Sequence, residues 1–187
     1  SSAAGLVAAT TAKRIHGDKD VSVITKQAKT LIPCGIPYIF GSVGSSEKDI
    51  LPAEKMFEAN GVNVIHEEVE LINRENCTVK LTNGEEIGYE KLIIGTGSLP
   101  YKPGWLKGSD LDNVFSVPKN KVYLDEMQKK LEGCKKVITI GAGFIGVEFS
   151  DELNKIGKEV VLVEKLPHIL GLAFDEDTLF VKTGNEY

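Results

Sequence analysis

The chain contains little cysteine, few aromatic side chains and no excess of positive charge. Its 187 residues include 7% aromatics and three cysteines, at positions 34, 77 and 134. An odd, scattered set of cysteines fits a reducing cytoplasm better than a disulfide framework. The three positions lack the spacing of a metal site, so no metal is expected.

Other absences narrow the function classes further. A net charge of −5 without a basic stripe argues against nucleic acid as the main partner. The longest apolar stretches fall far below the roughly 20 residues that cross a bilayer, so no membrane partner is expected. Secretion is not expected either, because no charged and then apolar leader is visible. With 42% hydrophobic and 26% charged residues, the composition predicts a soluble α/β protein with a sizeable core.

A dinucleotide-binding pattern runs from residue 135 to 165. Gly141, Gly143 and Gly146 directly follow the apolar run 137–140, so we predict strand, helix and strand in this order. Gly141 permits the tight turn, Gly143 lets the backbone approach a pyrophosphate, and Gly146 lets helix and strand pack closely. The phosphates would meet the unpaired N–H groups and the positive dipole end of the helix.

A carboxylate ends the second predicted strand of this unit. The apolar run 160–163 leads into Glu164, 23 residues after Gly141, where it can accept hydrogen bonds from the adenosine ribose hydroxyls. Because Glu164 would repel a 2′-phosphate, we expect NADH to be preferred over NADPH. Phe144 and Ile145, at the start of the helix, complete the expected NAD(P)H-binding residues. The alternative is a glycine-rich turn of another α/β sheet.

The start of the chain carries a second, incomplete copy of the pattern. Gly5 matches the third glycine and Ser2 the second, and a helix and a strand are predicted to follow. The first glycine and its strand would precede the first residue, so we expect a fragment that lacks an N-terminal strand. Thr25 stands where a ribose carboxylate is usual, so its hydroxyl or Lys26 would serve. The alternative is that residues 1–16 are simply an amphipathic surface helix.

The stretch between the two units has a different character. Asn83-Gly84 predicts a hairpin turn, because both residues tolerate positive φ. The glycine- and proline-rich segment 95–104 is typical of a crossover between domains. The remaining patterns predict helices over 50–60 and 123–131, and strands within 62–72, 77–81 and 87–94.

Three further motifs link the chain to a known family. Residues 32–38 read Ile-Pro-Cys-Gly-Ile-Pro-Tyr, residues 92–98 read Leu-Ile-Ile-Gly-Thr-Gly-Ser, and Glu148 follows the glycine pattern. In this order they resemble the pyridine nucleotide-disulfide oxidoreductases, within which the single-cysteine branch of coenzyme A disulfide reductase, NADH oxidase and NADH peroxidase is most similar. Residues 32–38 look like the redox-cysteine motif at the head of a helix. Residues 92–98, with Thr96 and Gly97, look like the second FAD motif, and Glu148 like the glutamate near the nicotinamide.

This resemblance implies an architecture and a set of cofactors. The fold would be α/β, a Rossmann-like two-dinucleotide-binding flavoprotein fold that is partial, without its first FAD strand and its C-terminal portion. Residues 1–117 would form the FAD-binding domain, and residues 118–187 the N-terminal part of the NAD(P)-binding domain. FAD and NAD(P)H would be the cofactors. The intact protein would be a cytoplasmic homodimer that acts on a small-molecule acceptor.

Cys34 is the residue expected to carry catalysis. The positive end of a helix dipole favours a thiolate, and only the thiolate attacks a disulfide or a peroxide. The next cysteine is Cys77, so Cys34 would cycle between thiolate and either a mixed disulfide or a sulfenic acid. The alternative for Cys34 is a buried structural cysteine.

The predicted function follows from these motifs together. We expect an FAD-dependent NAD(P)H oxidoreductase that reduces a disulfide, persulfide, peroxide or oxygen through the flavin and Cys34. The alternative is a non-catalytic dinucleotide-binding fragment or assembly module.

Overall fold

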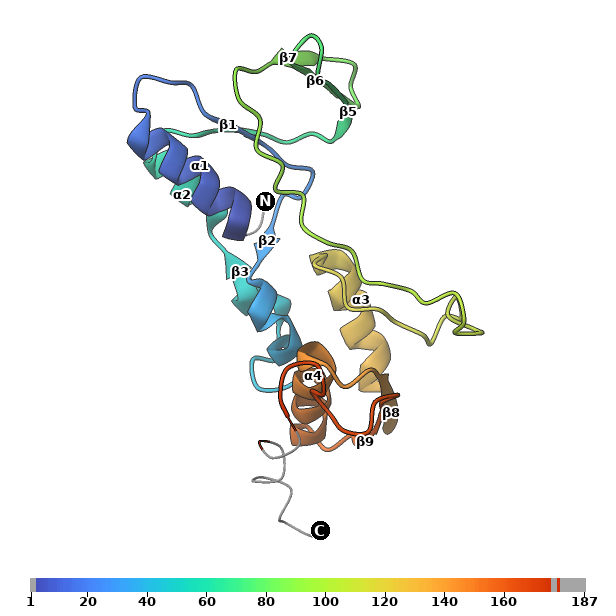
Figure 1. Ribbon diagram of the computed structural model, residues 1–187. Helices are drawn as coiled ribbons and strands as arrows, with labels where there is room; N and C mark the ends of the chain where they lie inside the picture. The colour runs from blue at the N-terminus through green and yellow to red at the C-terminus, as the bar shows by residue number, and fades with distance from the viewer. Residues whose placement is uncertain (1–2, 176–177, 179–187) are drawn as a thin grey trace. The chain divides into compact units, whose positions relative to one another are not determined.

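The computed structural model describes residues 3–175 and residue 178 (Figure 1). The chain forms two compact units, one of residues up to 33 together with 50–124, the other of residues 34–49 together with those from 125 on. The predicted boundary between residues 117 and 118 concerns the two nucleotide-binding domains and stays a prediction. No described helix is long and apolar enough to cross a membrane.

The elements are α1 (Ala3–Ile15), β1 (Ser22–Ile24), β2 (Thr30–Leu31), η1 (Pro33–Phe40), η2 (Ser46–Asp49), β3 (Ile50–Leu51), α2 (Ala53–Ala59), β4 (Asn63–Ile65), β5 (Val69–Asn73), β6 (Thr78–Leu81), β7 (Glu86–Gly88), α3 (Lys121–Glu132), β8 (Lys136–Ile140), α4 (Phe144–Lys155) and β9 (Glu159–Val163).

The core of the first unit lies between two helices and a pair of parallel strands. α1 and α2 lie side by side (Figure 1), and β1 pairs with β4 in the register Val23 to Val64. Phe57 is almost fully buried at the centre of this core. The predicted helix and strand at the start of the chain are therefore confirmed as α1 and β1. The core residues are Leu6, Ala9, Ala53, Phe57 and Val62, with Val21, Val23, Leu51 and Val64 partly buried against them.

The helix predicted over residues 50–60 is shorter than expected. Its first two residues form β3, which pairs antiparallel with β2, and the helix α2 begins at Ala53. Pro52 explains the difference, because its ring disfavours the helical conformation of the residue before it, Leu51. The predicted end of the helix is confirmed, since Asn60 is the C-cap and the N–H of Gly61 donates to the carbonyl of Glu58 at 3.0 Å.

Three antiparallel strands, β5, β6 and β7, form a separate small sheet in this unit (Figure 1). The predicted hairpin lies between β6 and β7, with Gly84 at φ +90°. The N–H of Leu81 donates to the carbonyl of Glu85 at 2.8 Å and closes the turn. Glycine suits this position because an L side chain at positive φ is strained.

The strand predicted at the end of the run 87–94 is absent. β7 ends at Gly88, and Ile93 and Ile94 are 65% and 66% exposed. A strand exists only where its backbone N–H and C=O groups find a neighbouring strand. In the described part of the chain, β1 and β4 pair only with each other, so they provide no such neighbour. The apolar pattern at 91–94 is therefore typical of a strand, but the segment does not form one because it has, among the described residues, no neighbouring strand with which to form hydrogen bonds.

The second unit confirms the predicted strand, helix and strand over residues 135–165. β8 and β9 pair in parallel, with Ile138 opposite Val161, and α4 connects them. The segment that contains Cys34 belongs to the same unit. The ring of Phe40 in η1 packs edge-on against Phe149 of α4, with centroids 4.8 Å apart. Gln128 of α3 donates its side-chain N–H groups to two carbonyls of this segment, at 3.1 and 3.0 Å. Helices α3 and α4 therefore both hold η1.

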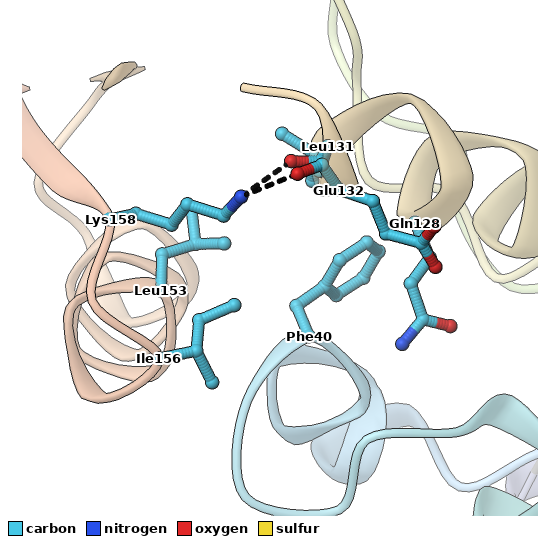
Figure 2. Close-up of a pocket in the computed structure, with 7 residues that line it drawn as sticks. All are labelled: Phe40, Gln128, Leu131, Glu132, Leu153, Ile156 and Lys158. Carbon is cyan, nitrogen blue, oxygen red and sulfur yellow. Dashed lines mark hydrogen bonds between the residues drawn. The ribbon is translucent and has the colours of Figure 1, made fainter. Parts of the chain in front are cut away.

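Lys158 satisfies the end of α3 (Figure 2). The last carbonyls of a helix have no intrahelical donors. The ammonium of Lys158 donates to two of them, on Leu131 at 2.7 Å and Glu132 at 3.3 Å, and to the carbonyl of Cys134 just beyond the helix at 2.6 Å. This cation also opposes the negative end of the helix dipole. It borders a cavity of about 270 Å³ lined by Phe40, Gln128, Leu131, Glu132, Leu153, Ile156 and Lys158.

Replacement of Lys158 tests this cap. Lys158→Met keeps the aliphatic stem but removes three donors, so we expect the free energy of unfolding to fall by about 1–2 kcal/mol. Urea denaturation followed by circular dichroism measures this loss. Lys129→Met, at an exposed position on the same helix, makes the same charge change. An equal loss in both variants would contradict a specific cap.

Candidate functional site

The glycine turn between β8 and α4 depends on glycine at two of its three glycine positions. Gly141 has φ +97°, so the turn uses a conformation that other residues rarely adopt. A Cβ atom on Gly146 would overlap the carbonyl oxygen of Gly141, so only glycine lets the helix approach this closely. A Cβ on Gly143 would meet no atom within 4 Å. The backbone thus needs glycine at positions 141 and 146, while at 143 the glycine leaves open space.

The start of α4 faces this open space without a side-chain cap. Gly143 is the N-cap residue in an extended conformation, and no side chain bonds to the first turn. The N–H groups of Phe144 and Ile145 belong to the first turn, where a helix offers no acceptors of its own. Both side chains are exposed. The arrangement suits an anion such as a phosphate, as predicted from the glycine pattern.

Glu164 lies at the end of β9 and fastens the glycine turn. Its Oε2 accepts the N–H of Ala142 at 2.6 Å, and its Oε1 accepts those of Lys165 and Leu166 at 2.6 and 2.9 Å. The N–H groups of Leu166 and Ala142 lower the pKa of Glu164 against the effect of desolvation. A carboxylate has about four acceptor positions, so one remains for a ribose hydroxyl. The structural role was not anticipated, while the ribose contact stays a prediction.

In the first unit the structure brings Gly5 and the segment 92–98 together. A Cβ on Gly95 would lie 3.5 Å from the Cα and 3.6 Å from the N of Gly5, so this segment passes close to the start of α1. Thr96 and Gly97 follow directly and are exposed. Two motifs that the resemblance assigns to the same nucleotide therefore lie beside each other. Ser2 lies outside the described residues.

Thr25 and Lys26 both have partners in the first unit. The N–H of Thr25 donates to the carbonyl of Ile65 at 3.0 Å and extends the pairing of β1 with β4. The ammonium of Lys26 pairs with the carboxylate of Glu68 at 2.8 Å, and both side chains are more than half exposed. A contact of either residue with the adenosine ribose stays a prediction.

Cys34 lies in the first turn of η1, which is a 3₁₀ helix. Its thiol is free and exposed, so it is not a buried structural cysteine. The residues that anchor η1 are the buried Ile36, Ile39 and Phe40. Because the anchor is apolar and the thiol lies outside it, Cys34 is accessible to a small molecule.

Two buried carboxylates beside this segment escaped the sequence analysis. Asp49 lies against Gly35, where a Cβ atom would overlap its carboxylate. Glu152 is buried on α4, between Phe149 and Leu153 on the apolar side of the helix. An acid inside an apolar stripe was a signal for Glu152, whereas nothing in the pattern around Asp49 predicts burial. Glu148, the predicted neighbour of the nicotinamide, is half-buried one helical turn before Glu152.

Neither a metal cluster nor the cavity of Figure 2 enters this site. Among residues 3–175 and 178, no group of three or more histidine, cysteine and acidic side chains could hold a metal ion. The seven residues that line the cavity include none of the predicted site residues. The candidate features are therefore the segment 92–98 in the first unit, and the glycine turn and Cys34 in the second.

Comparison with known proteins identifies the family. The sequence model of the pyridine nucleotide-disulphide oxidoreductases matches residues 1–179. The chain belongs to this family. An NADH oxidase of Methanocaldococcus jannaschii is 33% identical over 95% of this chain and 41% of its own length. A CoA-dependent NAD(P)H sulfur oxidoreductase of Pyrococcus furiosus is 32% identical over 94% of this chain and 40% of its own length.

A solved structure of the same kind confirms the fold class. The water-forming NADH oxidase of Lactobacillus brevis bound to NADH superposes with a TM-score of 0.84 at 26% identity, covering 96% of this chain and 41% of that one. The predicted Rossmann-like α/β fold of a pyridine nucleotide-disulphide oxidoreductase is thus confirmed. The chain spans about two fifths of the length of these relatives.

Two glycine variants separate the packing of this family member from its nucleotide binding. Gly146→Ala forces a methyl group into the Gly141 carbonyl, so we expect a loss of about 1–3 kcal/mol in unfolding free energy and weaker NADH binding. Gly143→Ala adds a methyl group in open space, so we expect unchanged thermal stability but NADH affinity at least about tenfold lower. Thermal unfolding and NADH titration by fluorescence measure both quantities. If Gly143→Ala left the affinity unchanged, the phosphates would not lie at this turn.

Proposed function

We propose that the whole protein is an FAD-dependent NAD(P)H oxidoreductase that reduces a small-molecule disulfide, persulfide, peroxide or dioxygen through Cys34. The observation that carries this proposal is the exposed Cys34 thiol on an anchored helix, in the unit that also contains the glycine turn. The names of the two curated relatives support it, since one is an NADH oxidase and the other a CoA-dependent NAD(P)H sulfur oxidoreductase.

NADH is the electron donor in this proposal. The open space at Gly143 and the N–H groups at the start of α4 suit its pyrophosphate. The ionised Glu164 would accept a ribose hydroxyl and repel a 2′-phosphate, which favours NADH over NADPH. Glu148 would lie near the nicotinamide ring. The solved structure of the Lactobacillus brevis NADH oxidase, which is bound to NADH, supports NADH as the electron donor.

FAD is the second cofactor in this proposal, and Gly5, Thr96 and Gly97 would hold it. The start of α1 presents first-turn N–H groups, and the close approach of Gly95 to Gly5 leaves only backbone at this place. When bound, FAD would supply two-electron transfer between the nicotinamide and the sulfur. The protein's contribution is to orient both nucleotides and to set the charge around them.

Cys34 would exchange sulfur bonds with the acceptor. Its thiolate attacks one sulfur of a disulfide R–S–S–R, so that the Cys34–S–S–R bond forms and RS⁻ leaves to take a proton. Two electrons and one proton then break the new bond and give RSH and the Cys34 thiolate. The sum is NADH + H⁺ + RSSR → NAD⁺ + 2 RSH. With hydrogen peroxide, the thiolate takes one oxygen atom to become a sulfenate, and one water is released. Two electrons and two protons then reduce the sulfenate to the thiolate and release a second water.

The setting of the whole protein is part of the same proposal. The three free, exposed cysteines suit a reducing compartment, so we place the protein in the cytoplasm. A homodimer is proposed from the resemblance to the single-cysteine branch.

Replacement of Glu164 tests the preference for NADH. Glu164→Ala removes the charge that would meet a 2′-phosphate, so we expect kcat/KM for NADPH relative to NADH to rise by about tenfold or more. Glu159→Ala, on the same strand and paired with Lys136 on the surface, is the matched control. Thermal unfolding shows how much of the change comes from the released glycine turn. An unchanged preference would mean that Glu164 does not reach the ribose.

Replacement of Cys34 tests the reaction itself. In the full-length flavoprotein, Cys34→Ser removes the nucleophile but leaves both nucleotide sites, so we expect NADH to bleach the flavin as before while disulfide or peroxide reduction falls by at least about 100-fold. Visible absorption without oxygen and a turnover assay measure the two steps. Cys77→Ser and Cys134→Ser are the controls. Unchanged turnover in Cys34→Ser would overturn the redox role, and a colourless protein that takes up no FAD would favour the non-catalytic module.

A further inference from the structure

A buried carboxyl group lies near each end of η1, the 3₁₀ helix that carries Cys34. Asp49 is 5% exposed and Glu152 is 1% exposed, and they are the buried acids of the described residues. Each lies against a glycine of this segment, Asp49 against Gly35 and Glu152 against Gly41. Gly35 directly follows Cys34, and Gly41 directly follows η1. The two acids thus flank the helix that carries the exposed thiol.

Glu152 holds the turn after η1 through its side chain. Its Oε2 accepts both the backbone N–H and the hydroxyl of Ser42, each at 2.6 Å. Its Oε1 accepts the ammonium of Lys155 at 2.7 Å. A Cβ atom on Gly41 would overlap the carboxylate, so the turn lies directly on it. A short, directional contact therefore joins the backbone of this turn to α4.

The charge of Glu152 is maintained despite its burial. Burial raises its pKa, but the hydrogen bonds from Lys155 and Ser42 outweigh this effect and lower the pKa to about 2. Lys155 also pairs with Asp151 at 2.7 Å. Glu152 is therefore ionised near neutral pH, and its contribution to stability is lost only as the pH falls from the ordinary carboxyl range towards 2. Because a buried ion pair is costly to form, an apolar residue would serve packing alone equally well.

Asp49 holds the other end of η1. A Cβ atom on Gly35 would overlap its carboxylate, which places the buried side chain against the backbone next to Cys34. Its helical turn, η2, is tied in turn to α3, because the hydroxyl of Ser46 donates to the carboxylate of Asp125. Gly35, which follows Cys34, therefore packs on Asp49, and the turn η2 that contains Asp49 is itself held by α3.

We propose that Asp49 and Glu152 are positioning residues for Cys34. A 3₁₀ helix is less stable than an α-helix, and the glycines at both of its ends add backbone freedom. The apolar side of η1 resists separation but sets its rotation weakly. The hydrogen bonds from Ser42 to Glu152 set the rotation and the register at one end, and the packing of Asp49 on Gly35 fixes the other end. The inference rests on the proposed redox role of Cys34, and it assigns the cost of burying two carboxyl groups to the orientation of the thiol.

Hydrogen exchange provides a readout that does not depend on catalysis. In Glu152→Ala, we expect the amides of residues 34–42 to exchange at least about tenfold faster, with the amides of β8 and β9 unchanged. Asp49→Ala should do the same for residues 34–36. Lys158→Met removes hydrogen bonds to the carbonyls of residues 131, 132 and 134 in the same unit, so it is the control for a loss of stability that begins at the end of α3. Uniform acceleration throughout the unit would overturn the proposal, because the acid would then act on stability alone.

Kinetics of the full-length flavoprotein provide the second test. In Glu152→Ala we expect bleaching of the flavin by NADH at the normal rate and a kcat for disulfide reduction about tenfold lower. Glu152→Gln keeps an acceptor for Ser42, so we expect it to restore the rate to within about threefold of the original. Ser42→Ala, which removes one hydrogen bond, is the mild variant if Glu152→Ala does not fold, and it should lower kcat by about twofold to threefold.

A parallel Cys34→Ser measurement separates the two hypotheses. If Cys34→Ser abolishes disulfide reduction while Glu152→Ala and Ser42→Ala leave kcat unchanged, the positioning role is wrong and the proposed function stands. If Cys34→Ser itself leaves turnover unchanged, the proposed function fails and the positioning role fails with it.

Discussion

The close approach of α4 to the turn after β8 is the constraint on which the second unit depends. Gly146 lies so near the carbonyl of Gly141 that no side chain fits between them. This approach sets where α4 begins, and therefore where its first N–H groups point. It also lets Glu164, at the end of the neighbouring strand, accept the N–H of Ala142 and close the turn. One steric requirement thus arranges the helix, the turn and the acid together.

The same helix joins the glycine turn to the segment that contains Cys34. Its first turn faces the open space at Gly143, and its third turn carries Glu152, which holds the backbone at Ser42. The ring of Phe149 lies between them and packs on Phe40. Phosphate binding is proposed at the start of α4, and Glu152 supports the Cys34 segment near its end. Because the helix is rigid, it fixes the positions of the glycine turn and the Cys34 segment relative to each other. This is a physical reason for placing Glu152 and Phe149 on one side of α4.

Local patterns predicted the elements whose causes are local. The apolar runs around Gly141 and Glu164, the turn at Gly84 and the exposed position of a thiol between Pro33 and Gly35 all depend on neighbours in sequence. The strand expected at 91–94 failed because a strand depends on a partner, which no local pattern provides. The helix predicted at Ile50 and Leu51 is absent for a different reason. Pro52 disfavours the helical conformation of the residue before it, and this effect outweighs the helical pattern of the sequence.

The acids that hold the Cys34 segment lay beyond sequence reasoning because burial is a property of the assembled unit. Asp49 and Asp151 are both acids in helical turns, yet the first is buried and the second is exposed. The difference is that Asp49 packs against Gly35. The periodicity of the apolar residues in the sequence does not mark this contact. Neither Gly35 nor Gly41 has a positive φ, and the space beside each is filled by a carboxyl group from elsewhere in the unit. Gly35 and Gly41 are therefore explained by what lies against them, whereas Gly44, at φ +71°, is explained by the turn it makes.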